Sequence, residues 1–271
     1  MQYEAENNKE NQNIEQENIN KNIVKNEYNE QENINKNIVK NEYIDNLESE
    51  DSEVLLAYKA ETKGEYYKAI EHYNNAILRN PEYGITYKHL GNVYYRIGRL
   101  KDAEKYLEKA CELLPDYPTA HYELGLVYYR QVNLRRGLEQ LQKTLEIDPN
   151  FLMAHYWLGI LNYHYGHLRE AKKHYTIVTL RNPDFTIAFF HLGVCNLELG
   201  CYEESEKNFL QVISKNPDSA ATYANLADTY LNLNKRYEAK LAFIKALELD
   251  PEDRKAQRGL AAIEDFKDVE F

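Results

Sequence analysis

The 34 residues from 84 to 117 read GITYKHLGNVYYRIGRLKDAEKYLEKACELLPDY, and their pattern returns along the chain. Proline marks the period most plainly. Six of the seven prolines lie 34 residues apart, at Pro81, Pro115, Pro149, Pro183, Pro217 and Pro251. A fixed period of this length predicts one structural unit repeated in tandem, because unrelated sequence does not space a rare residue so evenly.

Four further series keep the same period, and each keeps one kind of side chain. Leucine recurs at Leu56, Leu90, Leu124, Leu158, Leu192 and Leu226. The residue after each leucine is small: Ala57, Gly91, Gly125, Gly159, Gly193 and Ala227. A second small series consists of Ala69, Ala103, Gly137, Ala171, Ser205 and Ala239. A large side chain recurs at Tyr73, Leu107, Leu141, Tyr175, Phe209 and Phe243.

Each unit is predicted to be a pair of helices. Apolar residues fall at helical spacing in residues 85–95 and again in residues 103–114. Gly98 separates the two stretches, at a left-handed cap that needs no Cβ. Pro115 ends the second helix, because proline has no N–H and clashes with the preceding turn. The turn residue is Gly64, Gly98, Gly166 or Gly200 in four units, and Val132 or Asn234 in two others.

The small residues predict where the two helices touch. Gly91 is expected to lie against the second helix near Ala103, so that the two backbones approach closely. Leu107, from the large series, is expected to fill the space beside that contact.

The pattern resembles the tetratricopeptide repeat (TPR) family, whose unit carries leucine-glycine, then tyrosine, alanine, an aromatic residue, alanine and proline. The resemblance is read in HLGNVYY around Gly91, ELGLVYY around Gly125 and WLGILNY around Gly159. Asn162 and Asn196 depart from it, since other units have tyrosine there. The resemblance implies an all-α fold, a right-handed superhelical solenoid of tandem helix-turn-helix repeats that binds other proteins.

Three parts are predicted along the chain. Residues 1–49 are a low-complexity tail rich in Asn, Glu and Lys. Residues 50–251 hold the six repeats, at 50–83, 84–117, 118–151, 152–185, 186–219 and 220–253. Residues 254–271 are a capping helix and tail, in which Leu260 and Ala261 repeat the leucine-small pair and polar residues suit a terminal helix facing water.

The tail contains a duplication with a period of 15 residues. ENINKNIVKNEY occurs at residues 17–28 and again, unchanged, at residues 32–43. So few apolar residues do not offset chain entropy, which predicts disorder. The alternative is a helix that docks in the solenoid's own groove or on a partner. Its apolar stripe would consist of Ile19, Ile23, Val24, Ile34, Ile38 and Val39.

Charge and composition narrow the class of partner and the location. The net charge of −11 argues against nucleic acid as a partner. No apolar run approaches the roughly 18 residues of a membrane span, and the first ten residues are acidic and polar rather than a signal segment. The three cysteines, Cys111, Cys195 and Cys201, show no paired framework. These features predict a cytoplasmic protein.

The family resemblance implies that the first helix of each pair lines a concave groove where a partner binds. The candidate groove residues are Lys88, Asn92, Tyr95, Arg96, Tyr122, Leu126, Tyr129, Arg130, Met153, Tyr156, Trp157, Ile160, Tyr163, Phe190 and Val194. This set is aromatic and apolar in the middle repeats and basic at Lys88, Arg96 and Arg130. We expect a partner with apolar anchors and some acidic residues, and Trp157 is the leading anchor candidate.

The sequence allows two other interpretations of the groove residues. In the first, Trp157 and Tyr156 pack between neighbouring first helices and leave no open surface. Some TPR proteins grip a C-terminal carboxylate with a Lys and Asn pair, an Asn in the next repeat, and a Lys and Arg pair in the third. Lys88 and Asn92 match the first pair, but Glu123 stands at the next position and repels a carboxylate, which excludes that mechanism here.

Catalysis is not predicted. The chain has no Gly-rich phosphate loop, no GxSxG and no HExxH, and we expect no cofactor and no metal. His121 and His155 are expected to be groove-edge or packing residues, and His164, His167 and His174 lack a repeated carboxylate or cysteine beside them. The leading function is a scaffold or adaptor; the alternatives are an assembly factor or co-chaperone for a secretion, pilus or ciliary machine, and a regulatory subunit holding an enzyme. The oligomeric state is open.

Overall fold

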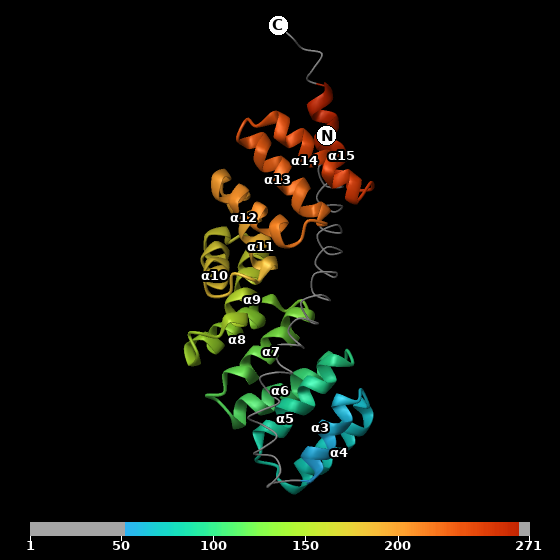
Figure 1. Ribbon diagram of the computed structural model, residues 1–271. Coiled ribbons are helices and arrows are strands. Elements are labelled where there is room, and N and C mark those ends of the chain that lie inside the picture. Colours follow the sequence, from blue (N-terminus) through green and yellow to red (C-terminus); the bar gives the residue numbers. More distant parts are fainter. Residues whose placement is uncertain (1–51, 266–271) are drawn as a thin grey trace, which may run out of the picture. The chain divides into compact units, whose positions relative to one another are not determined.

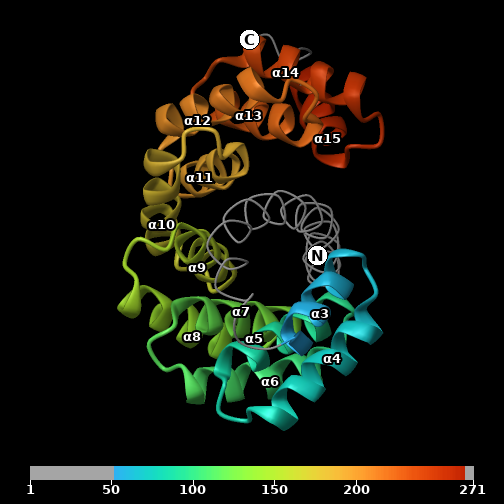
Figure 2. The same ribbon diagram turned by 60° about the horizontal axis from the view of Figure 1, so that its bottom comes forward.

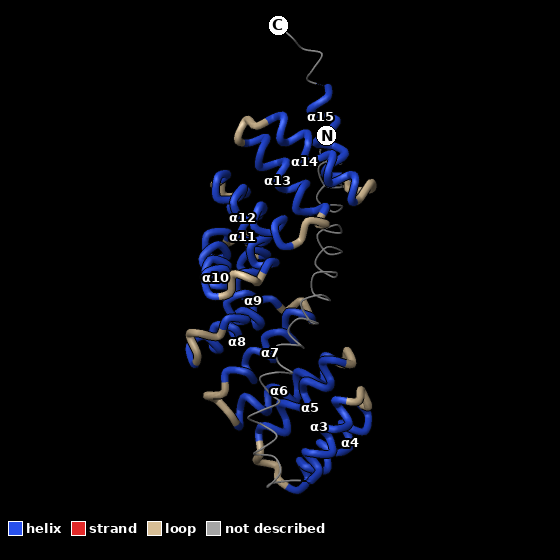
Figure 3. The backbone as a smooth tube through the Cα atoms, in the orientation of Figure 1, coloured by secondary structure: helices blue, strands red, loops and turns tan. Residues whose placement is uncertain are grey.

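A computed structural model describes residues 52–265 of the chain. The described residues form thirteen α-helices and no strand (Figure 3). The helices are α3 (Ser52–Thr62), α4 (Tyr66–Arg79), α5 (Gly84–Arg96), α6 (Leu100–Leu113), α7 (Pro118–Arg130), α8 (Leu134–Ile147), α9 (Leu152–His164), α10 (Leu168–Arg181), α11 (Thr186–Glu198), α12 (Tyr202–Lys215), α13 (Ala220–Asn232), α14 (Arg236–Leu249) and α15 (Arg254–Asp265). The all-α repeat fold is confirmed. The predicted tail at 1–49, with its duplicated segment, lies outside the described residues.

The chain divides into two units, and each is described by itself. Unit 1 contributes the helix pair α3 and α4 (Figure 1). Ala57 on α3 and Tyr73 on α4 are fully buried, and the Tyr73 hydroxyl donates to a carboxylate oxygen of Glu61 over 3.0 Å. Glu53 accepts from His72 over 2.7 Å and from Arg79 over 3.0 Å, so its carboxylate joins the start of α3 to α4.

Unit 2 holds α5 to α15 in two layers. Each helix packs against the next one along the chain. Figure 2 shows that α5, α7, α9, α11 and α13 lie on the inner, concave side of this unit, while α6, α8, α10, α12 and α14 lie on its outer side. The first helix of every pair in unit 2 is therefore an inner helix.

The small residue after each leucine lets the two helices of a pair pack closely. A Cβ added to Gly91 would lie 2.6 Å from Leu107 Cγ, so the large residue of the second helix occupies the space that a side chain would need. The two small series also touch. A Cβ on Gly137 would lie 3.3 Å from the carbonyl oxygen of Gly125, and Ser205 Oγ donates to the carbonyl oxygen of Gly193 over 2.9 Å. The predicted contact of Gly91 with the second helix is present, and Leu107 fills the space beside it as predicted.

The turn inside each pair has one left-handed residue, whatever its side chain. Gly98 has a φ of 79°, and Val132 and Asn234 take the same conformation with φ values of 61° and 58°. The hydrogen bond that closes the turn is also kept, from Arg99 N to the Tyr94 oxygen over 2.9 Å and from Asn133 N to the Tyr128 oxygen over 2.8 Å. The two departures from glycine leave the turn unchanged.

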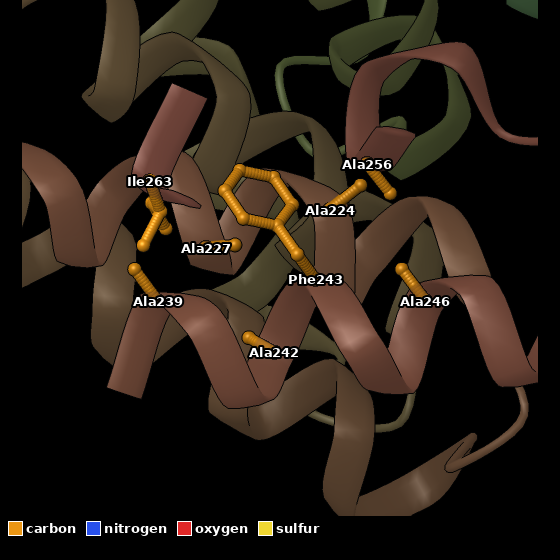
Figure 4. Close-up of a cluster of buried hydrophobic side chains, with 8 residues drawn as sticks. All are labelled: Ala224, Ala227, Ala239, Ala242, Phe243, Ala246, Ala256 and Ile263. Carbon is orange, nitrogen blue, oxygen red and sulfur yellow. The ribbon is translucent and has the colours of Figure 1, made fainter. Parts of the chain in front are cut away.

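Helix α15 packs against α14 and α13. The face of α15 that is buried differs from the predicted one. Ala256 and Ile263 are buried in the cluster drawn in Figure 4, together with Phe243 of α14. Leu260 packs against this cluster, but Ala261 is exposed. The small residue after the leucine contacts the second helix of its own pair elsewhere, and the described residues contain no helix after α15 for Ala261 to contact.

Candidate functional site: the inner face of unit 2

The candidate site consists of inner-face residues on α5, α7, α9 and α11, one set per repeat. All fifteen predicted groove residues lie on these four helices. Lys88, Tyr122, Leu126, Tyr156, Trp157 and Ile160 are buried. The partly exposed members are Asn92, Tyr95, Arg96, Tyr129, Met153, Tyr163, Phe190 and Val194, and Arg130 is exposed. Aromatic and aliphatic side chains thus meet solvent on consecutive inner helices.

A ladder of contacts joins successive inner helices at a constant offset of 35 residues. The Arg130 guanidinium lies 4.6 Å from the Tyr95 ring centre and donates to the Tyr95 carbonyl oxygen over 3.0 Å. One repeat later, the Tyr129 and His164 rings are 6.2 Å apart. In the next repeat the Tyr163 hydroxyl donates to a carboxylate oxygen of Glu198. The ladder holds the last turns of the inner helices in register.

The ladder also sets the charge of the site. Burial and the hydrogen bond to Glu198 raise the pKa of Tyr163, so its hydroxyl stays protonated and remains a donor. The Lys88 ammonium lies 4.0 Å from a Glu123 carboxylate oxygen. An acidic neighbour for Lys88 accords with the exclusion of a carboxylate grip at this position.

An aromatic cluster occupies the middle of the inner face. The Trp157 ring lies 5.0 Å from the Tyr129 ring and 5.9 Å from the Tyr156 ring. Tyr156 also packs on Phe185 at 5.0 Å and on Tyr175 at 6.1 Å. Tyr156 is therefore a packing residue, because its ring contacts belong to α10 and to the loop before α11 as well as to its own helix. Trp157 faces the α7 side, toward Tyr129.

Two buried nitrogens of the cluster have no hydrogen-bond partner among the described residues. They are Trp157 Nε1 and His191 Nε2, at equivalent places of neighbouring repeats. Trp157 keeps 5% of its surface exposed. Burial lowers the pKa of His191 to about 4, and the charge of His164 lowers it further, so the His191 imidazole is neutral at pH 7. A buried polar group without a partner costs about 1–3 kcal/mol.

Other titratable side chains belong to packing. His155 Nδ1 lies 3.0 Å from His174 Nδ1, and His121 Nδ1 lies 2.8 Å from Gln140 Oε1 one repeat earlier. His121 and His155 also contact the carbonyl oxygens of Pro115 and Pro149, so they join the two helices of a pair to the preceding turn. In the part of the chain that the structure describes, no three His, Cys, Asp or Glu side chains are grouped to hold a metal.

The cysteine thiols do not form a reactive set. Burial raises the pKa of Cys111 and of Cys195 to about 12, so both thiols are protonated at pH 7. None of the three cysteines forms a disulfide with another described residue. None of the described helices combines the length and the apolar character that crossing a bilayer requires.

Comparison with known families agrees with this architecture. A family model for the TPR repeat matches residues 91–132, and two models for the tetratricopeptide repeat match residues 165–221 and 220–253. The fold and the inner face define an α-helical repeat protein. More particularly, the chain is a tetratricopeptide repeat protein, and it belongs among protein–protein interaction scaffolds.

Solved structures share the fold. YrrB, described as a TPR protein with an unusual peptide-binding site, is 25% identical with a TM-score of 0.67, over 70% of this chain and 98% of that one. The C-terminal part of a TPR repeat-containing protein from Cytophaga hutchinsonii is 18% identical with a TM-score of 0.63, over 78% and 84%. MamA from Desulfovibrio magneticus RS-1 is 19% identical with a TM-score of 0.59, over 63% and 97%. No curated protein sequence matches the chain.

Proposed function

We propose that the inner face of α7, α9 and α11 binds a segment of a partner protein, without chemical turnover. The supporting observation is the aromatic cluster around Trp157, whose indole N–H has no acceptor among the described residues. Buried aromatic anchors beside an unsatisfied donor favour a ligand that supplies both apolar contact and an acceptor oxygen. The peptide-binding site named for YrrB supports the same kind of ligand.

The partner segment is expected to combine apolar anchors with an acidic residue. Tyr129, Met153 and Phe190 are partly exposed and supply apolar contact from three successive inner helices. Arg130 is exposed at the α7 end of this surface, with its guanidinium held over Tyr95. An acidic residue of the partner would lie near Arg130, and its apolar residues would extend toward α11. The net charge of −11 disfavours nucleic acid as the ligand.

Peptides selected from a displayed random library, with the full chain as bait, test this function. Selected sequences should share apolar residues and an acidic residue, and calorimetry should give a dissociation constant for each. Tyr129→Ala and Phe190→Ala should weaken binding by about tenfold or more, as expected for aromatic hot spots. Leu180→Ala, at an exposed position of α10, is the matched control and should bind normally. Selection of no peptide, or equal binding by all three variants, would contradict the proposal.

We also propose that the six repeats occupy residues 50–83, 84–117, 118–151, 152–185, 186–219 and 220–253 after a low-complexity tail at 1–49, and that the protein is cytoplasmic and has no catalytic activity. The choice between a general adaptor, an assembly factor and a regulatory subunit depends on the partner's identity, which the selected peptide sequences would help to find.

A further inference from the structure

Helix α14 carries an exposed apolar stripe on the outer side of unit 2. Tyr237, Leu241 and Ile244 are 72%, 49% and 36% exposed, and their spacing of four and three residues places them on one face. The opposite face of α14 is already used, since Phe243 and Ala246 are buried in the cluster of Figure 4. Helix α14 is thus apolar on two faces, of which only one has a partner in the described structure.

The same places on the other outer helices of unit 2 are mostly charged or polar. The residues equivalent to Tyr237 are Lys101, Arg135, Arg169 and Glu203. Those equivalent to Leu241 are Lys105, Glu139, Lys173 and Lys207. Those equivalent to Ile244 are Glu108, Gln142, Thr176 and Leu210. Leu210 of α12, at the place equivalent to Ile244, is exposed as well. Single exposed apolar residues are ordinary, but a stripe that replaces a charged face indicates contact with another molecule.

We propose that α14 is a homodimer contact, in which it packs antiparallel against α14 of a second copy of this chain around Leu241. Helix geometry makes this pairing self-complementary. With about 1.5 Å of rise and about 100° of rotation per residue, Tyr237 and Ile244 lie on one flank of Leu241, and Glu238 and Lys245 lie on the other. Rotation about the twofold axis places Tyr237 beside Ile244 of the second copy, and Glu238 beside Lys245 of the second copy. Each contact occurs twice.

Charge selects a second copy in this orientation. Glu238 and Lys245 are both exposed. Lys245 also lies 2.9 Å from Glu248 on its own helix, but both groups are about half exposed, so this local pair is weak and does not prevent a contact across the axis. A parallel pairing would instead place Glu238 beside Tyr237 of the second copy and Lys245 beside Ile244, so neither charge would gain an opposite partner. A helix pair of this size is smaller than a standard stable interface, so we expect a dissociation constant on the order of micromolar.

Sedimentation velocity of the full chain over a range of concentrations tests the dimer. The wild type should shift from the mass of one chain toward the mass of two as its concentration rises. Leu241→Glu should stay at the mass of one chain. Leu180→Glu, which places the same charge at an exposed position of α10, should behave as wild type. Circular dichroism should show equal helix content in all three, since each substitution lies on an exposed surface.

A charge exchange tests the orientation. Glu238→Lys alone and Lys245→Glu alone should each weaken the dimer, because each places like charges across the axis twice. An equimolar mixture of the two variants should recover it, because both contacts then join Lys to Glu. A wild type that stays monomeric, a dimer that survives Leu241→Glu, or a mixture that does not recover would overturn the proposal. Peptide binding by the inner face plays no part in these outcomes.

Discussion

Val132 offers a sharp test of the turn that joins the two helices of a repeat. Its φ of 61° places a β-branched residue in the left-handed region, where four other repeats have glycine. An L-residue in this region costs about 1–2 kcal/mol, and a branched Cβ adds crowding. Val132 is 79% exposed, so its removal loses little buried surface. Glycine loses about 0.5–1 kcal/mol more chain entropy on folding. Val132→Gly should therefore stabilise the protein by about 1 kcal/mol.

Urea unfolding followed by circular dichroism measures this gain, as a higher midpoint at unchanged slope. Repeat proteins can lose cooperativity, so thermal melting should be recorded as a second measure. The reverse change, Gly98→Val, is the matched control and should destabilise by about 1 kcal/mol or more, because it introduces the same strain at the equivalent turn. A lower midpoint for Val132→Gly, or an unaffected Gly98→Val, would refute the account of the turn.

Two further predictions concern packing and pH. Gly159→Ala should destabilise the protein by about 1–3 kcal/mol in urea unfolding, because the added Cβ would lie 2.5 Å from the Tyr175 ring. Gly125→Ala should cost less, because its Cβ would lie 3.0 Å from the nearest atom, on Leu141. The opposite order would count against the packing described. Burial lowers the pKa values of His174 and His191 to about 4, so the unfolded chain takes up protons first, and the free energy of unfolding should fall as the pH drops from about 6.5 toward 4, by about 1.4 kcal/mol per pH unit for each histidine. His191→Phe should reduce that slope, and an unchanged slope would show that His191 does not contribute.

The repeat and its turns were predictable from single-residue chemistry. Pro115 lacks an N–H, and Gly98 accepts a positive φ, and neither property depends on distant contacts. Because these residue types recur every 34 residues, the same turn is predicted in each repeat. The contact of Gly91 with the second helix followed in the same way, since only a missing side chain allows it.

Details of the inner face depend on how each helix is rotated against the next, which periodicity does not specify. Tyr156 and Trp157 are adjacent aromatic residues with the same appearance in the sequence. The structure separates them, because Tyr156 packs toward α10 and Trp157 toward Tyr129. The ladder from Tyr163 to Glu198 and the unpaired indole N–H of Trp157 were missed for the same reason. A search for pairs at an offset of 35 residues would have found the ladder, but not its geometry.

Unlike the details of the inner face, the exposed apolar stripe on α14 can be recognised in the sequence. Aligning the repeats shows apolar Tyr237 and Leu241 where α6, α8, α10 and α12 carry charge, although the first repeat also has a tyrosine, Tyr67, at the place of Tyr237. For the capping helix α15, the sequence pattern did not predict which residues are buried. The pair Leu260 and Ala261 continues the sequence pattern, but Ala261 is exposed, and the described residues contain no helix after α15 that it could contact.

The indole resonance of Trp157 tests partner binding by the inner face most directly. The chain has one tryptophan, so a ¹⁵N–¹H correlation spectrum has one indole N–H peak. Titration with a selected peptide should move this peak, with a downfield proton shift as the N–H gains an acceptor, and should slow its exchange with water. The peak of the unbound Tyr129→Ala variant gives the control position for a changed ring environment. An indole peak that stays in place while the peptide saturates the protein would contradict the account.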